Sequence, residues 1–107
     1  MDIEIIFRLQ GRKKAQWTQL LSQTGLDTDE NVDTTVLVWD NETLAATGSR
    51  KGNLFKCIAV DPSYQGQDLT ATVLTQLRQD AFGAGYRHLF LYTKPKNKLQ
   101  FSSLFFY

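Results

Sequence analysis

The segment Lys56–Leu77 reads as a strand, a turn and a helix, and the junction of strand and helix could hold a phosphate. The apolar run ends at Asp61, a loop containing Gly66 follows, and a helix is expected from Leu69. Backbone N–H groups in the first turn of a helix lack intrahelical partners and lie at the positive end of the helix dipole. The chemistry that this spacing supports is backbone binding of a phosphate or pyrophosphate by Gln67–Thr70.

Two features of this loop support other interpretations. Gly66 can simply allow a tight turn between the strand and the helix. The carboxylate of Asp68 stabilises a helix N-terminus by itself and repels a phosphate placed there. At about 5 Å and an intermediate dielectric this repulsion is roughly 3 kcal/mol, or about two decades of affinity, and less where water screens it. Phosphate binding and a plain turn therefore both remain open.

Few side chains could perform covalent chemistry. Cys57 lies on the apolar strand with no histidine near it in the sequence, which favours a buried thiol over a nucleophile. His88 is expected to cap the start of a strand. The chain has one histidine and one cysteine, which is too few for a cluster of metal ligands of these types.

Apolar periodicity predicts the elements that position these residues. Turn residues separate the elements, and Gly52 and Asn53 can adopt positive φ between two expected strands. The expected strands are Ile3–Leu9, Thr35–Trp39, Leu44–Gly48, Leu54–Val60 and His88–Tyr92, and the expected helices are Lys13–Gln23, Leu69–Ala81 and Asn97–Ser103. This order predicts an α/β (α+β) fold in one domain over residues 1–107.

Composition narrows the partners and the location of the chain. The formal net charge of +1 gives no electrostatic case for nucleic acid or for an anionic membrane surface. The longest apolar runs are far shorter than a membrane span, and the acidic start at Met1–Glu4 is unlike a signal peptide. A cytoplasmic location is the expectation.

The run Val60–Ala71 resembles the acyl-CoA-binding motif of GNAT-type N-acetyltransferases. That motif reads Arg/Gln-x-x-Gly-x-Gly/Ala after a strand and a Pro-aromatic pair. Gln65 fits its first position and Gly66 fits a glycine common just after it, whereas Asp68 and Thr70 stand where the family has Gly, and Gly or Ala.

This resemblance implies a mixed sheet with helices on both faces and a site for acetyl-CoA or CoA. The pantetheine arm would run along the backbone of one strand, and the pyrophosphate would lie at the following helix N-terminus. The implied cofactor-binding residues are Cys57, Ile58, Ala59, Val60, Gln65, Gly66, Gln67, Asp68, Leu69 and Thr70.

A closer resemblance includes the flanking segments Gly52–Val60, His88–Pro95 and Phe101–Ser103, which look like the N-terminal domain of the citrate lyase ligase family. That family acetylates the prosthetic group of an acyl carrier subunit with ATP and acetate. The resemblance implies an acyl carrier protein or citrate lyase subunit as a partner. The family's ATP site has a His-x-Gly-His-type motif in its C-terminal domain, and this chain has only His88, so no ligase site is expected here.

The resemblance leaves the catalytic residues unknown. GNAT enzymes often use a tyrosine of the last helix as general acid, and the matching position here is Phe101, which has no hydroxyl. The Leu54–Val60 strand carries no Asp or Glu that could act as a base. Three hypotheses follow: an acyl-CoA-dependent acetyltransferase, a non-catalytic module that docks an acyl carrier protein or its prosthetic group, and a remnant without a ligand.

The C-terminal end of the sheet is expected to be incomplete and to favour association. GNAT domains continue with one or two further strands, so the sheet is expected to be incomplete at the C-terminus, after its fifth strand. An unpaired sheet edge beside the apolar tail Leu104–Tyr107 favours association. The sequence therefore predicts a homodimer, or a swapped element, through the exposed C-terminal edge.

Overall fold

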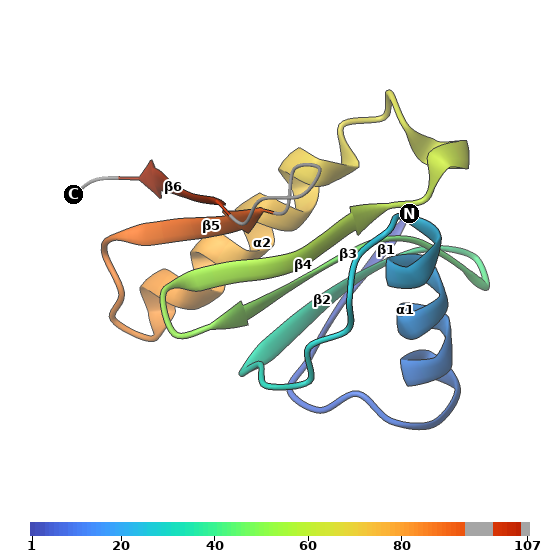
Figure 1. The fold of residues 1–107 in the computed structure, drawn as a ribbon, viewed down its shortest axis with the longest axis horizontal. Coiled ribbons are helices and arrows are strands. Elements are labelled where there is room, and N and C mark those ends of the chain that lie inside the picture. Colours follow the sequence, from blue (N-terminus) through green and yellow to red (C-terminus); the bar gives the residue numbers. More distant parts are fainter. Residues whose placement is uncertain (94–99, 106–107) are drawn as a thin grey trace.

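The chain forms one sheet of six strands with a helix on each face (Figure 1). The structure, a computed structural model, describes the backbone of residues 1–93 and 100–105 and the side chains of residues 1–91. The elements are β1 (Asp2–Ile6), α1 (Gly11–Gln23), β2 (Thr34–Asp40), β3 (Thr43–Lys51), β4 (Leu54–Val60), the short 3₁₀ helix η1 (Pro62–Tyr64), α2 (Leu69–Gly83), β5 (Leu89–Thr93) and β6 (Gln100–Phe105). Neither described helix is long and apolar enough to cross a membrane.

The strands lie in the sheet in the order of the sequence, from β1 to β6. Neighbouring strands are antiparallel, except that β4 and β5 are parallel. A parallel pair needs a crossover between its strands, and α2 is that crossover. The sheet is therefore mixed, as the resemblance to GNAT-type N-acetyltransferases implied.

The two helices cover opposite faces because successive side chains of a strand alternate between faces. Val36 and Val38 of β2 pack in a core cluster with Val73 of α2. Leu37, between them, packs with Trp17 of α1 in a second cluster. The side chains of Trp17, Val36, Leu37 and Val38 all have an exposed fraction of 0%. Both faces of β2 are therefore covered, which explains why its sequence is a continuous apolar run, and its side chains enter two separate cores.

The expected mixed sheet and its two main helices are confirmed, with shifts at the ends of the elements. The Leu54–Val60 strand matches β4, while β3 extends beyond the expected Leu44–Gly48 to Thr43–Lys51. In the turn that follows, Gly52 has a positive φ of 60°, whereas Asn53 does not have one.

The expected helix Asn97–Ser103 is wrong where the structure describes it. Gln100–Phe105 is the strand β6, which pairs antiparallel with β5, so the sheet continues beyond its fifth strand. Residues 97–99 lie outside the described residues. A seven-residue helix is marginal on its own, whereas the open edge of β5 offers a row of backbone partners, and this tertiary pairing overrides the local pattern.

Gly48 of β3 allows α2 to lie close against the sheet. A Cβ at this position would be 2.3 Å from Cγ1 of Val73 and 3.1 Å from Cδ1 of Leu77. Because the valine methyl group is held close to the helix backbone, the helix itself must shift. We expect Gly48→Ala to lower the free energy of unfolding by about 1–3 kcal/mol, measured by chemical denaturation.

Gly83→Ala is the matched control for this prediction. Gly83 ends α2, and a Cβ there would meet no atom within 4 Å. This variant should be neutral or slightly stabilising, because alanine has the higher helix propensity. Equal stabilities for the two variants would contradict the role assigned to Gly48.

Candidate functional site

The parallel strands β4 and β5 pair over a short distance only. Within the described residues their register contains two pairs, Leu54 with Phe90 and Phe55 with Leu91. β4 continues to Val60, so the pairing stops near its beginning. The edge of Lys56–Val60 that faces β5 is outside this ladder, and its backbone N–H and C=O groups can pair with an extended ligand, as a sheet edge pairs with an added strand.

A β-bulge lies at the point where this pairing stops. Lys56 pairs with Ser49 and Ala59 with Thr47, so Cys57 and Ile58 together stand opposite Gly48 alone. The bulge gives Cys57 a positive φ of 55°, which is rare for a residue other than glycine, asparagine or aspartate. It bends β4 and changes the direction of the side chains that follow.

The β4 side chains from the bulge onward pack in the two cores rather than facing a ligand. Cys57 and Ala59 pack in the cluster beneath α1, and Ile58 and Val60 pack against the cluster beneath α2. Cys57 is half-buried, and this partial burial raises the pKa of its thiol, which favours the protonated form over the nucleophilic thiolate. What remains for a ligand on Cys57–Val60 is the backbone.

The loop after β4 is anchored at both ends. The N–H of Asp61 donates to the carbonyl of Ala45 at 2.8 Å, which fixes the end of β4 against β3. The Asp61 carboxylate accepts from the N–H of Ser63 at 2.8 Å and caps η1. The hydroxyl of Tyr64 donates to the carboxylate of Asp40 at 2.7 Å, and this hydrogen bond raises the pKa of Tyr64. These contacts hold the loop to the end of β2.

Residues Gln65–Asp68 lead exposed into α2. Gly66 has φ 88° and Asp68 has φ 56° and ψ 31°, both in the left-handed region. Asp68 occupies the N-cap position without a side-chain hydrogen bond to the helix, and its carbonyl accepts from the N–H of Thr72 at 3.2 Å. The N–H groups of Leu69, Thr70 and Ala71 precede that bond and have no intrahelical acceptor. The Leu69 side chain is in the core, so it fixes the helix start while the first turn faces outward.

The ten residues expected to bind a cofactor therefore fall into two groups joined by Asp61–Tyr64. Cys57, Ile58, Ala59 and Val60 follow the point where β4 leaves β5, and Gln65, Gly66, Gln67, Asp68, Leu69 and Thr70 form the loop and first turn of α2. Their binding role stays a prediction. Phe101, matched in sequence to a tyrosine of a last helix, lies on the strand β6 instead. His88 directly precedes β5, where a strand cap was expected.

We expect Tyr64→Phe to loosen this loop. Without the hydroxyl, the Asp40 carboxylate has no bond from the loop, and amide exchange at Gln65–Asp68 should become roughly threefold to tenfold faster. Hydrogen exchange followed by mass spectrometry or NMR measures this change. Asp40→Asn is the control, because its amide oxygen can still accept the hydroxyl. Unchanged exchange in Tyr64→Phe would show that the Asp61 contacts alone hold the loop.

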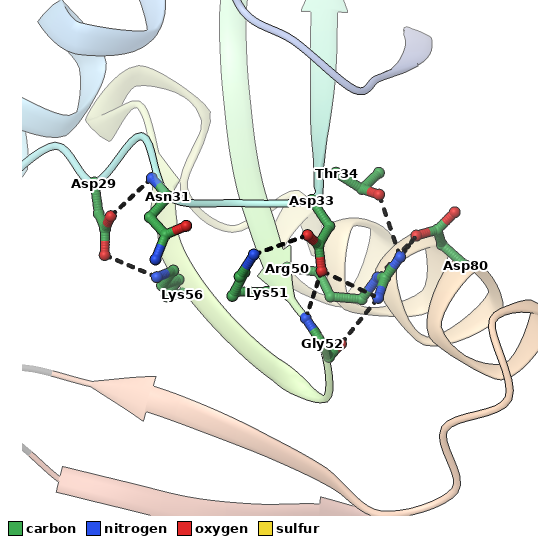
Figure 2. Close-up of polar contacts among 9 residues, drawn as sticks. All are labelled: Asp29, Asn31, Asp33, Thr34, Arg50, Lys51, Gly52, Lys56 and Asp80. Carbon is green, nitrogen blue, oxygen red and sulfur yellow. Dashed lines mark hydrogen bonds and ion pairs between the residues drawn. The ribbon is translucent and has the colours of Figure 1, made fainter.

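A network of polar side chains at the other end of β3 and β4 escaped the sequence analysis (Figure 2). Arg50, with an exposed fraction of 6%, donates from Nε to Asp80 of α2 at 2.8 Å and from Nη1 to the carbonyl of Gly52 at 2.9 Å. Its Nη2 lies 2.6 Å from the same Asp80 oxygen, and its guanidinium lies 5.8 Å from the ring centre of Tyr86. These contacts tie the β3–β4 turn to α2.

Asp33 belongs to the same cluster, and Asp29 forms a separate ion pair nearby (Figure 2). Asp33 accepts the N–H of Gly52 at 2.7 Å, and this bond, with the nearby Lys51, lowers the pKa of Asp33. Asp29 pairs with the buried ammonium of Lys56 at 2.8 Å, and that hydrogen bond lowers the pKa of Asp29. No local sequence pattern could have predicted these pairs, because their partners are 18 to 30 residues apart in the sequence. The pairs are Lys51–Asp33, Lys56–Asp29 and Arg50–Asp80.

In this mixed sheet the parallel strands β4 and β5 separate after a short pairing, and the N-terminus of α2 is open beside them. This arrangement defines an acyl-CoA N-acyltransferase type of fold. Two solved structures share it. An acyl-CoA N-acyltransferase from Pseudomonas aeruginosa superposes with a TM-score of 0.72 at 13% identity, over 87% of this chain and 79% of that one. A GNAT family acetyltransferase from Brucella melitensis, in complex with acetyl-CoA, gives 0.67 at 12% identity, over 99% and 89%. At these identities the likeness concerns the fold.

The chain belongs to the Acetyltransferase (GNAT) family, whose profile matches residues 4–100. It is also similar to two curated bacterial proteins named citrate (pro-3S)-lyase ligase. It is 34% identical to that of Escherichia coli K12 over 94 residues, which is 88% of this chain, and 36% identical to that of Haemophilus influenzae over 88 residues, which is 81%. The chain spans 27% and 26% of the length of these ligases.

Proposed function

We propose that this domain binds acetyl-CoA or CoA. The pantetheine arm pairs with the backbone of Cys57–Val60, and the pyrophosphate lies on the N–H groups at Gln65–Thr70. The observation that carries the proposal is the short β4–β5 ladder, beyond which the edge of β4 pairs with no strand among the described residues, just before an exposed helix N-terminus. Family membership supports it, as do solved relatives named as complexes with CoA or acetyl-CoA.

The geometry at Asp68 is compatible with this proposal. Its carboxylate makes no capping hydrogen bond, so it does not occupy the N–H groups of the first turn. Its negative charge nevertheless opposes a pyrophosphate in that turn. We therefore expect weak binding of the cofactor, and the side chain of Asp68 is the cause to test.

A titration of isotope-labelled protein with acetyl-CoA, followed by backbone amide spectra, tests the proposal. Saturable shifts confined to Cys57–Val60 and Gln65–Thr70 are the expected result. Spectra that do not change at millimolar acetyl-CoA would overturn it. Release of free thiol from acetyl-CoA in the presence of a panel of amines would then measure transfer separately from binding.

The alternative function is docking of an acyl carrier protein through its prosthetic group. It uses the same two elements, because a phosphopantetheine arm also offers an extended amide chain and a phosphate. The curated relatives are named as ligases of citrate lyase, which makes a carrier subunit of that enzyme the partner to try first. Titration with 4′-phosphopantetheine separates the two functions: equal affinity for it and for CoA favours docking, and a clear preference for CoA favours cofactor binding.

A further inference from the structure

The first residues of the chain present an apolar stripe to the solvent. Met1, Ile3, Ile5 and Phe7 have exposed fractions of 56%, 43%, 40% and 74%. Of the six large hydrophobic side chains exposed in the described part of the chain, these are four, and they occupy alternate positions. Ile3 and Ile5 lie on β1, where alternate residues point to one face, while Met1 directly precedes the strand and Phe7 lies in the bend that follows it.

The stripe continues the face of the sheet on which α2 lies. Ile3 pairs with Val38 and Ile5 with Val36, and both valines belong to the cluster beneath α2. That helix packs mainly over β2, β3 and β4, and Ile3 and Ile5 of β1 keep their exposed fractions beside it. β1 is also the end strand of the sheet as described, so its outer backbone groups have no strand partner. An apolar, unpaired edge of this kind is a template for another strand.

We propose that β1 pairs antiparallel with β1 of a second copy of this chain, about a two-fold axis at Ile5. A two-fold interface must be complementary to itself, and the order of apolar and charged residues along this strand meets that condition. With the axis at Ile5, Ile3 faces the partner's Phe7, the two Ile5 side chains meet, and Asp2 faces the partner's Arg8. The stripe is then apolar against apolar, and opposite charges meet at both ends of the pair.

The neighbouring register is less favourable. An axis at Glu4 would set two Glu4 carboxylates opposite each other and would leave Asp2 without an opposite charge, whereas the Ile5 register keeps the Asp2–Arg8 pairs and sets Glu4 against the partner's Ile6. Glu4 already accepts from Lys13 at 2.5 Å and from the indole N–H of Trp39 at 3.1 Å, so it is held in place on the α1 side. The Ile5 register keeps those bonds. It requires the bend at Phe7 and Arg8, which directly follows β1, to straighten into the strand.

Two short strands bury a small area, so the dimer should be weak. Interfaces at the low end of the size range belong to transient complexes. We expect a monomer at low micromolar concentration and a dimer that grows toward high micromolar concentration, measured by light scattering or by sedimentation equilibrium. This dimer is independent of cofactor binding, since β1 and the β4–β5 edge lie at different places in the strand order.

Ile5→Lys is the first variant, because it sets two ammonium groups opposite each other at the axis. The dissociation constant of the dimer should rise at least tenfold. Phe90→Lys is the matched control: Phe90 has an exposed fraction of 37% and lies on β5, so the dimer should be unaffected. Circular dichroism confirms that both variants fold.

A charge reversal tests the register itself. Asp2→Lys and Arg8→Glu should each weaken the dimer severalfold, and the double variant should restore it, because Asp2 then again meets an opposite charge. A monomer at every concentration would overturn the proposal. So would a dimer that resists Ile5→Lys, which is the result expected if the C-terminal edge, predicted from the sequence, carries the association.

Discussion

Asp68→Gly is expected to tighten binding of CoA by roughly tenfold. Asp68 has the left-handed backbone conformation with φ 56°, which glycine adopts without strain, so the loop should keep its path. The substitution removes a negative charge beside the N–H groups proposed to hold the pyrophosphate. The full repulsion at about 5 Å would be worth roughly a hundredfold, but the side chain is exposed and water screens part of it. Calorimetric titration of CoA measures the change.

Asp68→Asn separates charge from backbone freedom. Asparagine also tolerates the left-handed conformation and keeps the size of the side chain, so it should give most of the gain. Glu30→Gln is the control for a general change in net charge: Glu30 pairs with Lys14 in an exposed position after α1 and should leave affinity unchanged. If neither Asp68 variant binds CoA more tightly than the parent chain, the loop does not direct its N–H groups at a phosphate.

Asp80→Ala is expected to lower the free energy of unfolding by about 2–3 kcal/mol. The side chain of Arg50 is 7% exposed, and Asp80 is the carboxylate in closest contact with it. Removing Asp80 leaves the guanidinium buried with the Gly52 carbonyl, the Thr34 hydroxyl and a more distant Asp33, 4.0 Å away. An incompletely compensated buried charge carries a large penalty, which the 21% exposure of Asp80 moderates. Urea denaturation measures the loss.

Two further variants show whether the unpaired charge is the cause. Arg50→Met combined with Asp80→Leu should be more stable than Asp80→Ala alone, because no charge is then left buried. Lys51→Ala removes a pair whose side chains are 47% and 41% exposed and should cost less than about 1 kcal/mol. If Asp80→Ala is no more harmful than Lys51→Ala, then Arg50 is solvated well enough to need no partner.

The candidate site could be predicted from the sequence because its parts are consecutive along the chain. A strand that ends at Val60, a glycine in the loop and a helix from Leu69 can be read in order along the chain, and the structure has each of them. The separation of β4 from β5 could not be read in this way. It depends on how far two strands nearly 30 residues apart stay in register, and on a bulge whose two residues, Cys57 and Ile58, oppose Gly48.

The sequence by itself determined the order of the elements through β5 and the α/β class, because apolar periodicity and turn residues act over a few positions. Only the tertiary structure decided the fate of Gln100–Phe105, the partners of Arg50 and the exposure of the stripe on β1. Each of these depends on which surface lies opposite. A free edge on β5 turns an expected helix into a strand, a distant aspartate compensates a buried cation, and Ile3 and Ile5 of β1 stay partly exposed beside the area that α2 covers.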